Sequence, residues 1–140
     1  MDADLCFAPA TQLRRLIGDK EVSIGELTKL FYRRIEELNP RLNAYLALCP
    51  DQALAAARAA QAAVQRRRRG ESLGPLHGIP ISIKDLELSR GIRSTMGSLA
   101  FKNHVPAEDS VVVERVRRSG AVILGKTNTP EFGLSGTTEN

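Results

Sequence analysis

The sequence predicts an α/β fold, in which a helical region over residues 1–73 precedes the strands and helices of a layered core over residues 74–140. Apolar residues recur at helical spacing through the first region. From Gly74 onward, glycine and proline become frequent, and the apolar runs become short and β-branched. A strand, a helix and another strand are expected there in that order, which favours a layered α/β arrangement of about one domain.

Two helices are expected in the first 40 residues. One covers residues 11–18, with Thr11 at its N-cap. The next begins at a capping box, S-x-x-E, in which Ser23 and Glu26 can each satisfy a free backbone N–H group. Pro40 is expected to end this helix, because proline disfavours the helical conformation of the residue before it.

A third helix is expected from Asp51 to about residue 69. Alanine, the best helix former, dominates this stretch, and Asp51 lies at the positive end of the helix dipole. Residues 43–48 form a short apolar stretch of uncertain type. Residues 70–74 are expected to be a linker.

The second region contains two expected strands. Residues 79–83 form an apolar run with Pro80 near its start, where the missing backbone donor does least harm. A helix is expected after it, capped by Asp109 or Ser110. Residues 121–124 are continuously apolar, which is typical of a strand covered on both faces. The order of these elements favours a parallel pair of strands.

The net charge is a modest formal +4, from 20 Lys and Arg against 16 Asp and Glu. Much of the surplus comes from the consecutive arginines at positions 66–69, which lack the interleaved aromatic residues and motifs of a nucleic-acid-binding segment. A solvated helix end is the simpler interpretation, since cations there oppose the negative end of the helix dipole. Nucleic acid is therefore not expected as a partner.

No metal site, disulfide framework or membrane span is predicted. Cys6 and Cys49 lie far apart, and with His77 and His104 they fit no zinc-ligand spacing. The most apolar-looking stretch, residues 53–64, is too short to span a bilayer, and no signal peptide is apparent. A cytoplasmic protein is expected, without a membrane partner.

Lys84 is the residue best suited to chemistry. It ends the apolar run of the first strand, and α/β folds usually place their sites at strand ends. Apolar surroundings make an ammonium group costly, so a lysine placed there can serve as a base. The alternative, which the pattern alone favours, is a surface lysine paired with its neighbour Asp85.

The sequence GIPISIKD, at residues 78–85, is similar to the block around the catalytic lysine of the amidase signature family. The similarity continues through STMGS (94–98), PAEDS (106–110), GAVILGKTNTPEF (120–132) and GTTEN (136–140). The helical segment SIGELTKLFYRRIEELNPRLNAYL (23–46) also fits. The resemblance therefore covers nearly the whole chain and implies the layered mixed sheet of that family.

By this resemblance the chain is part of a hydrolase that cleaves the carbon–nitrogen bond of a small amide through a Ser/cis-Ser/Lys triad. One serine attacks the amide carbonyl, the cis-serine passes protons, and Lys84 is the ultimate base. Asp85 has a supporting role. No metal or organic cofactor is expected. The residues expected to line the substrate cleft are Thr127, Asn128, Phe132, Gly133 and Ser135.

The family's serine loop, which is similar to GGSSGG, does not occur in the 140 residues. The serines that lack its glycine setting, and that are not expected to be nucleophiles, are Ser82, Ser89, Ser94, Ser98 and Ser135. The chain is therefore expected to be an N-terminal fragment, a single partial domain with an incomplete sheet, inactive on its own. Its uncovered sheet is expected to promote self-association.

Three alternatives stay open. The first is the amidase-type component of the glutamine-dependent aspartyl/glutamyl-tRNA amidotransferase, its A subunit, whose partners would be the other amidotransferase subunits. The second is a non-catalytic binding fragment, and the third is the product of a broken gene. STMGS (94–98) and NTPEF (128–132) are more similar to general amidases than to the amidotransferase component.

Overall fold

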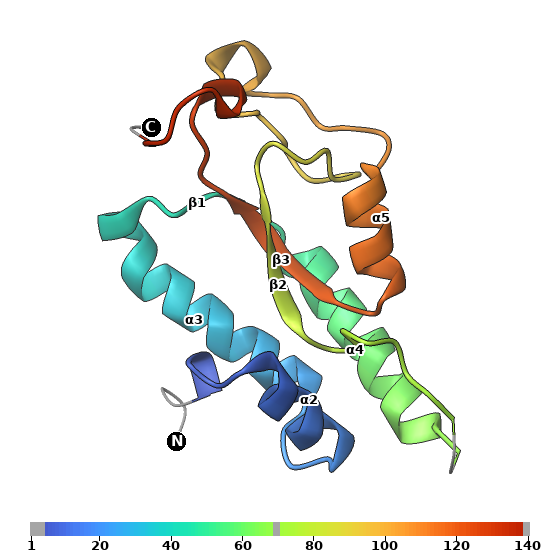
Figure 1. Cartoon of the computed structure of the whole chain (residues 1–140). Helices are drawn as coiled ribbons and strands as arrows, with labels where there is room; N and C mark the ends of the chain where they lie inside the picture. Colours follow the sequence, from blue (N-terminus) through green and yellow to red (C-terminus); the bar gives the residue numbers. More distant parts are fainter. Residues whose placement is uncertain (1–4, 69–70, 139–140) are drawn as a thin grey trace.

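The computed structural model describes residues 5–68 and 71–138, and it confirms the α/β class (Figure 1). The elements of this part of the chain are α2 (Ala10–Gly18), α3 (Ile24–Leu42), β1 (Tyr45–Leu48), α4 (Pro50–Arg66), β2 (Pro80–Lys84), η1 (Leu99–Phe101), α5 (Val111–Arg118), β3 (Val122–Thr127) and η2 (Glu131–Gly133). None of the helices described in it is long and apolar enough to cross a membrane.

The strands form one mixed sheet in the order β1-β3-β2. β2 runs parallel to β3, as expected, and the stretch of uncertain type becomes β1, which pairs with β3 in the antiparallel sense. Gly125 allows the close approach of β1, because a Cβ atom there would lie 2.3 Å from the Ala47 carbonyl oxygen. The sheet places the ends of β2 and β3 side by side, and this end carries Lys84.

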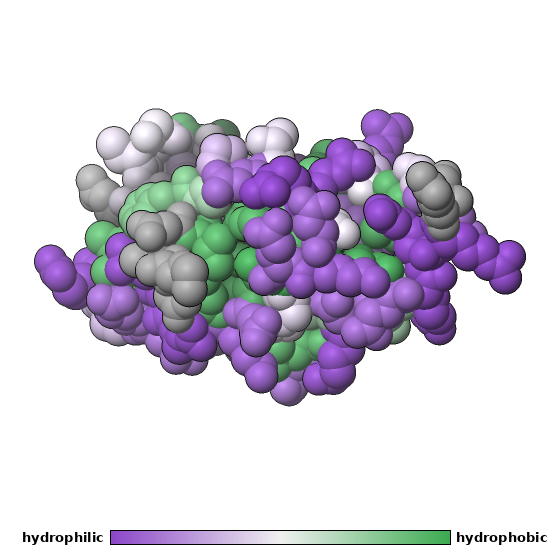
Figure 2. Space-filling model, turned by 90° about the horizontal axis from the view of Figure 1, so that it is seen from below, coloured by the Kyte–Doolittle hydropathy of each residue, from purple (hydrophilic) through white to green (hydrophobic). Residues whose placement is uncertain are grey.

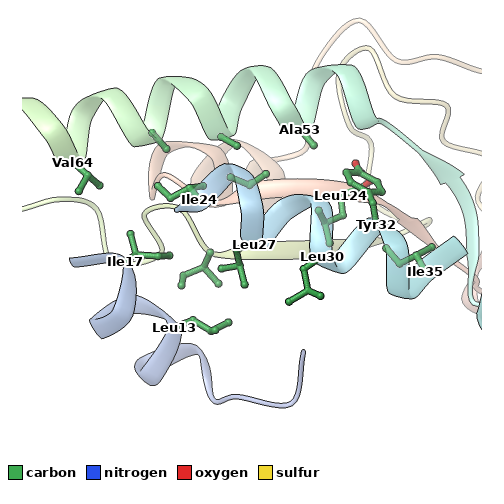
Figure 3. Packing of buried hydrophobic residues seen from close by; sticks show 14 residues of the cluster. Leu13, Ile17, Ile24, Leu27, Leu30, Tyr32, Ile35, Ala53, Val64 and Leu124 are labelled. Carbon is green, nitrogen blue, oxygen red and sulfur yellow. The ribbon is translucent and has the colours of Figure 1, made fainter. Parts of the chain in front are cut away.

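Helices cover both faces of the sheet. α3 and α4 pack on one face, where their apolar side chains meet Val122 and Leu124 of β3 (Figure 3). α5 covers the other face, where Val113 packs with Ile83 and Ile123. α2 lies beside the first part of α3, and its Leu13 and Ile17 belong to the same cluster as the side chains of α3 and α4 (Figure 3). The buried residues are mostly aliphatic, as the scarcity of aromatic residues requires.

The capping box at the start of α3 is confirmed. The Ser23 hydroxyl oxygen accepts a hydrogen bond from the Glu26 backbone N–H at 3.1 Å and donates to the Glu26 carboxylate at 2.6 Å.

We expect Ser23→Ala to lower the free energy of unfolding by about 1 kcal/mol, because the helix loses its cap. Urea unfolding measures this loss, with Ser72→Ala, which removes no helix cap, as a control; equal stability of all three chains would contradict it.

Several expected boundaries are wrong. α3 continues through Pro40 to Leu42, because the Asn39 side chain donates to the Tyr45 backbone C=O and accepts from the Tyr45 N–H just beyond the helix. Asn43, in the left-handed conformation (φ 47°), is the C-cap residue. Pro9 occupies the N-cap of α2, in place of Thr11.

Two further segments differ from expectation. α4 ends at Arg66, so the arginine run lies mostly beyond the helix; Arg69 and Gly70 are outside the described residues. β3 extends from the expected apolar run to Thr127. The added residues include a buried lysine, which a search for continuous apolar residues does not find.

Cys49 is buried where α4 begins against the sheet, and its thiol donates to the Ile123 carbonyl at 3.3 Å. Burial raises the pKa of this thiol above its ordinary value of 9.0. A raised pKa in the folded state means that the thiol's contribution to stability is present below pH 9.0 and is lost as the pH rises above it.

We therefore expect the stability advantage of the wild type over Cys49→Ala to shrink as the pH rises from 8 to 10. Because one proton is involved, this difference in free energy of unfolding can change by at most about 1.4 kcal/mol per pH unit. Denaturant unfolding at each pH measures the difference, with Cys6→Ala as the matched control. An advantage over Cys49→Ala that stays constant with pH would contradict the expectation.

Candidate functional site

Lys84 lies at the carboxyl end of β2, with Thr127 of β3 as its register partner. The pairing continues one residue further, where the Asp85 backbone N–H donates to the Thr127 carbonyl at 3.0 Å. The Lys84 side chain is exposed, so the described residues do not enclose its ammonium group in apolar surroundings. The strand end therefore presents an accessible amine at the place where α/β folds usually put their sites.

Asp85 does not pair with Lys84, contrary to the pairing expected from the pattern. Its side chain is buried and forms an ion pair with Lys126, whose Nζ lies 3.3 Å from Oδ1. Consecutive residues of an extended chain point to opposite faces, which explains why neighbours in sequence have different surroundings. The surface-pair alternative is therefore wrong for this lysine.

Lys126 was missed by the sequence reasoning, although it is the largest of the fully buried side chains in the part of the chain that the structure describes. Besides the Asp85 carboxylate, its ammonium group contacts the Ser94 hydroxyl at 2.8 Å and the Glu87 backbone carbonyl. Burial lowers the pKa of Lys126, and the Asp85 charge opposes that effect. A lysine directly after a continuous apolar run is the signal that could have indicated it.

The turn over residues 94–97 is bound to the strand end through Asp85. Oδ2 of Asp85 accepts hydrogen bonds from the Thr95 backbone N–H at 2.9 Å and the Thr95 hydroxyl at 2.5 Å. The Met96 N–H donates to the Asp85 carbonyl at 3.1 Å. Gly97 has a φ of +69°, and a Cβ atom there would lie 2.6 Å from the Thr129 carbonyl oxygen, so this position requires glycine.

The expected substrate segment follows β3 and folds back against this turn. The Phe132 N–H donates to the Met96 carbonyl at 2.8 Å, and the Phe132 ring lies edge-on to Phe101 at 6.1 Å. Phe132 adopts a left-handed conformation (φ 51°) and Gly133 follows with φ +72°. These contacts bring the aromatic segment to the same end of the sheet as Lys84.

The three other residues expected to line the substrate cleft, Thr127, Asn128 and Ser135, have different contacts. The Asn128 side-chain amide donates to the Asn43 carbonyl at 2.9 Å, which ties it to the end of α3. Ser135 is exposed and its hydroxyl lies 3.2 Å from that of Thr137. Thr127 is half-buried beside Lys84. The structure thus brings Thr127 next to Lys84, whereas the contacts of Asn128 are those of a loop anchor.

Other polar side chains that could suggest chemistry make contacts inside the fold. Ser94 and Lys126 form a Ser–Lys contact, but both are fully buried and neither can meet a substrate. The His77 ring donates from Nε2 to the Ala60 carbonyl at 3.0 Å, which holds the ring against α4. Among the residues described, no three His, Cys, Asp or Glu side chains are grouped closely enough to hold a metal ion.

Comparison with known proteins gives consistent similarities. The model of the family described as Amidase matches residues 26–140. The chain is 40% identical over 137 residues to the A subunit of glutamyl-tRNA(Gln) amidotransferase from Dehalococcoides mccartyi (strain CBDB1), over 98% of this chain and 27% of that protein. It therefore spans little more than a quarter of the length of this curated relative.

Two solved structures are similar to it over most of its length. One is the native peptide amidase from Stenotrophomonas maltophilia, with a TM-score of 0.79 and 37% identity over 89% of this chain and 25% of that chain. The other is a bacterial aryl acylamidase belonging to the amidase signature enzymes, with a TM-score of 0.85 and 30% identity over 95% of this chain and 27% of that chain.

Proposed function

Because the chain belongs to the amidase family, we propose that it supplies the base-bearing part of an enzyme that hydrolyses the carbon–nitrogen bond of a small amide. The observation that carries this proposal is the position of Lys84, which is exposed at the carboxyl end of β2 within the matched residues 26–140. A serine hydroxyl is a poor nucleophile without an adjacent base, and Lys84 is placed to act as that base.

The other site residues have supporting tasks in this proposal. Asp85 stabilises the end of β2 through the contacts of its buried carboxylate with Thr95 and Lys126. The residues assigned to the substrate side are Thr127, Asn128, Phe132, Gly133 and Ser135. Residues 1–73 form the helical N-terminal region and residues 74–140 begin the α/β catalytic core. The cytoplasm is the proposed location, and metal or organic cofactors are not required for the reaction.

The 140 residues alone are proposed to be inactive, because a base without a nucleophile cannot form an acyl-enzyme. The test is a hybrid in which residues 1–140 replace the matching segment of the Stenotrophomonas peptide amidase. The hybrid is expected to release ammonia from an amide that the peptide amidase hydrolyses, while the 140-residue chain releases none.

A hybrid that melts cooperatively, like its host, but has no turnover would overturn the proposal. Should the complete graft not fold, a graft of residues 74–140 alone repeats the measurement. Turnover by the 140-residue chain that disappears in Lys84→Ala would overturn the proposed inactivity alone.

A second candidate is the corresponding component of a glutamine-dependent tRNA amidotransferase. The 40% identity to the Dehalococcoides protein over 98% of this chain favours it. The other amidotransferase subunits would then be partners. Ammonia release from glutamine by the hybrid, increased when those subunits are added, would favour this candidate over a general amidase.

Self-association is a further part of the proposal. β1 and β2 are the edges of the described sheet, and an open edge offers unpaired backbone groups to another chain. Hydrophobic residues also reach the surface between hydrophilic ones on the face seen in Figure 2. Sedimentation is expected to give a mass that rises with concentration; a concentration-independent monomer would contradict this.

A further inference from the structure

We propose that the buried Lys126 is a positioning residue for the reaction: by holding the Asp85 carboxylate it fixes the backbone of Lys84 relative to the 94–97 turn. This inference rests on the proposed function of Lys84 as the base. Lys126 itself is fully buried and would not touch the substrate.

Asp85 is held by its backbone N–H, its backbone C=O and Oδ2 through hydrogen bonds, and by Oδ1 through the ion pair with Lys126 alone. Its N–H donates to Thr127, its C=O accepts from Met96, and its carboxylate meets Thr95 and Lys126. The peptide bond between Lys84 and Asp85 therefore has little freedom. A base works only when it lies within hydrogen-bond reach of its proton, so this restraint bears directly on the Lys84 amine.

The position of the Asp85 carboxylate depends on Lys126. The Lys126 ammonium group donates hydrogen bonds to the Ser94 hydroxyl and the Glu87 carbonyl, and it forms an ion pair with Oδ1 of Asp85 at 3.3 Å. These acceptors come from the two ends of the chain segment that follows Lys84, residues 85–94. Lys126 therefore closes that segment into a loop against β3 and holds the Asp85 carboxylate next to Thr95.

Lys126 is not itself placed to react with a substrate. The Ser94–Lys126 contact resembles an activated serine, but neither residue is exposed. A fully buried lysine whose ammonium group is held by Asp85, Ser94 and Glu87 cannot meet a substrate. Lys84 is exposed and accessible, which leaves Lys126 the positioning task.

The test uses the hybrid with Lys126→Met, with Asp85→Asn, and with both substitutions. Each single variant is expected to lower kcat about 100-fold, as an ångström-scale misplacement can, with little change in KM. The double variant has no unpaired buried charge, so it is expected to recover melting temperature but not kcat. Recovery of kcat together with melting temperature would show a structural role only and overturn the inference.

Two further variants keep the test decisive. Asp109→Asn breaks the Asp109–Arg117 ion pair, 3.0 Å long, and is expected to leave kcat unchanged. If the Lys126 variants do not fold, Thr95→Val takes their place: it keeps the Lys126–Asp85 pair but removes the hydroxyl, which donates to Asp85 and accepts from the Gly97 N–H. It is expected to lower kcat about tenfold. Unchanged kcat in Thr95→Val would then overturn the inference.

Comparing Lys84→Ala with Lys126→Met distinguishes a failure of the positioning inference from a failure of the proposed function. If the Lys84→Ala hybrid keeps its activity, the base assignment fails whatever Lys126 does. If Lys84→Ala is inactive and Lys126→Met is fully active, only the positioning inference fails.

Discussion

Replacing Lys84 by alanine in the hybrid is expected to lower kcat/KM by about 10³-fold, within the range that general bases contribute. The side chain is exposed, so its removal leaves no buried cavity or unpaired buried group. The melting temperature is therefore expected to stay close to that of the unmodified hybrid. Steady-state ammonia release, together with a thermal melt, measures both quantities.

Lys84→Arg distinguishes a base from a positive charge. Arginine keeps the charge but cannot be deprotonated in proteins, so it is expected to be as inactive as alanine. Lys102→Ala is the matched control, because Lys102 is another exposed lysine of the same region and its side chain has no role in the proposal. Activity retained in Lys84→Arg would mean that Lys84 acts through its charge alone.

Breaking the buried Asp85–Lys126 pair in the 140-residue chain is expected to lower the free energy of unfolding by about 3–5 kcal/mol in either single variant. Asp85→Asn leaves a buried ammonium without its carboxylate, and Lys126→Met leaves a buried carboxylate without its ammonium. Both groups are fully buried, so solvent screens neither charge.

The double variant is expected to be more stable than either single variant, because no unpaired charge remains. Denaturant unfolding of the four chains gives the coupling energy of the pair. Asp109→Asn, which breaks a pair whose arginine is partly exposed, is the control and is expected to cost less. Additive losses in the Asp85 and Lys126 variants would mean that the two charges do not stabilise each other.

Much of the fold followed from local patterns. The capping box at Ser23 and the cap at Ser110 begin α3 and α5 in the structure, because these signals act within one helical turn. The apolar runs predicted the parallel pair β2 and β3. Pro40 misled the prediction, because a rule about the residue before proline ignores the contacts that Asn39 makes beyond the helix.

The candidate site was only partly predictable. Lys84 was found because it ends an apolar run within a recognisable motif. The partner of Asp85 lies 41 positions away, on the neighbouring strand, and a search along the sequence had no reason to join Asp85 to Lys126. The pairing depends on the register of β2 against β3, which patterning alone does not give.

The most direct test of Lys84 as the base is its distance to a serine hydroxyl in a crystal structure of the hybrid. We predict that the Lys84 Nζ atom lies within hydrogen-bond reach, about 3 Å, of a serine of the glycine- and serine-rich loop, either directly or through one water molecule. A structure in which Lys84 points away from every serine of that loop, while the hybrid is active, would contradict the assignment of Lys84 as the base.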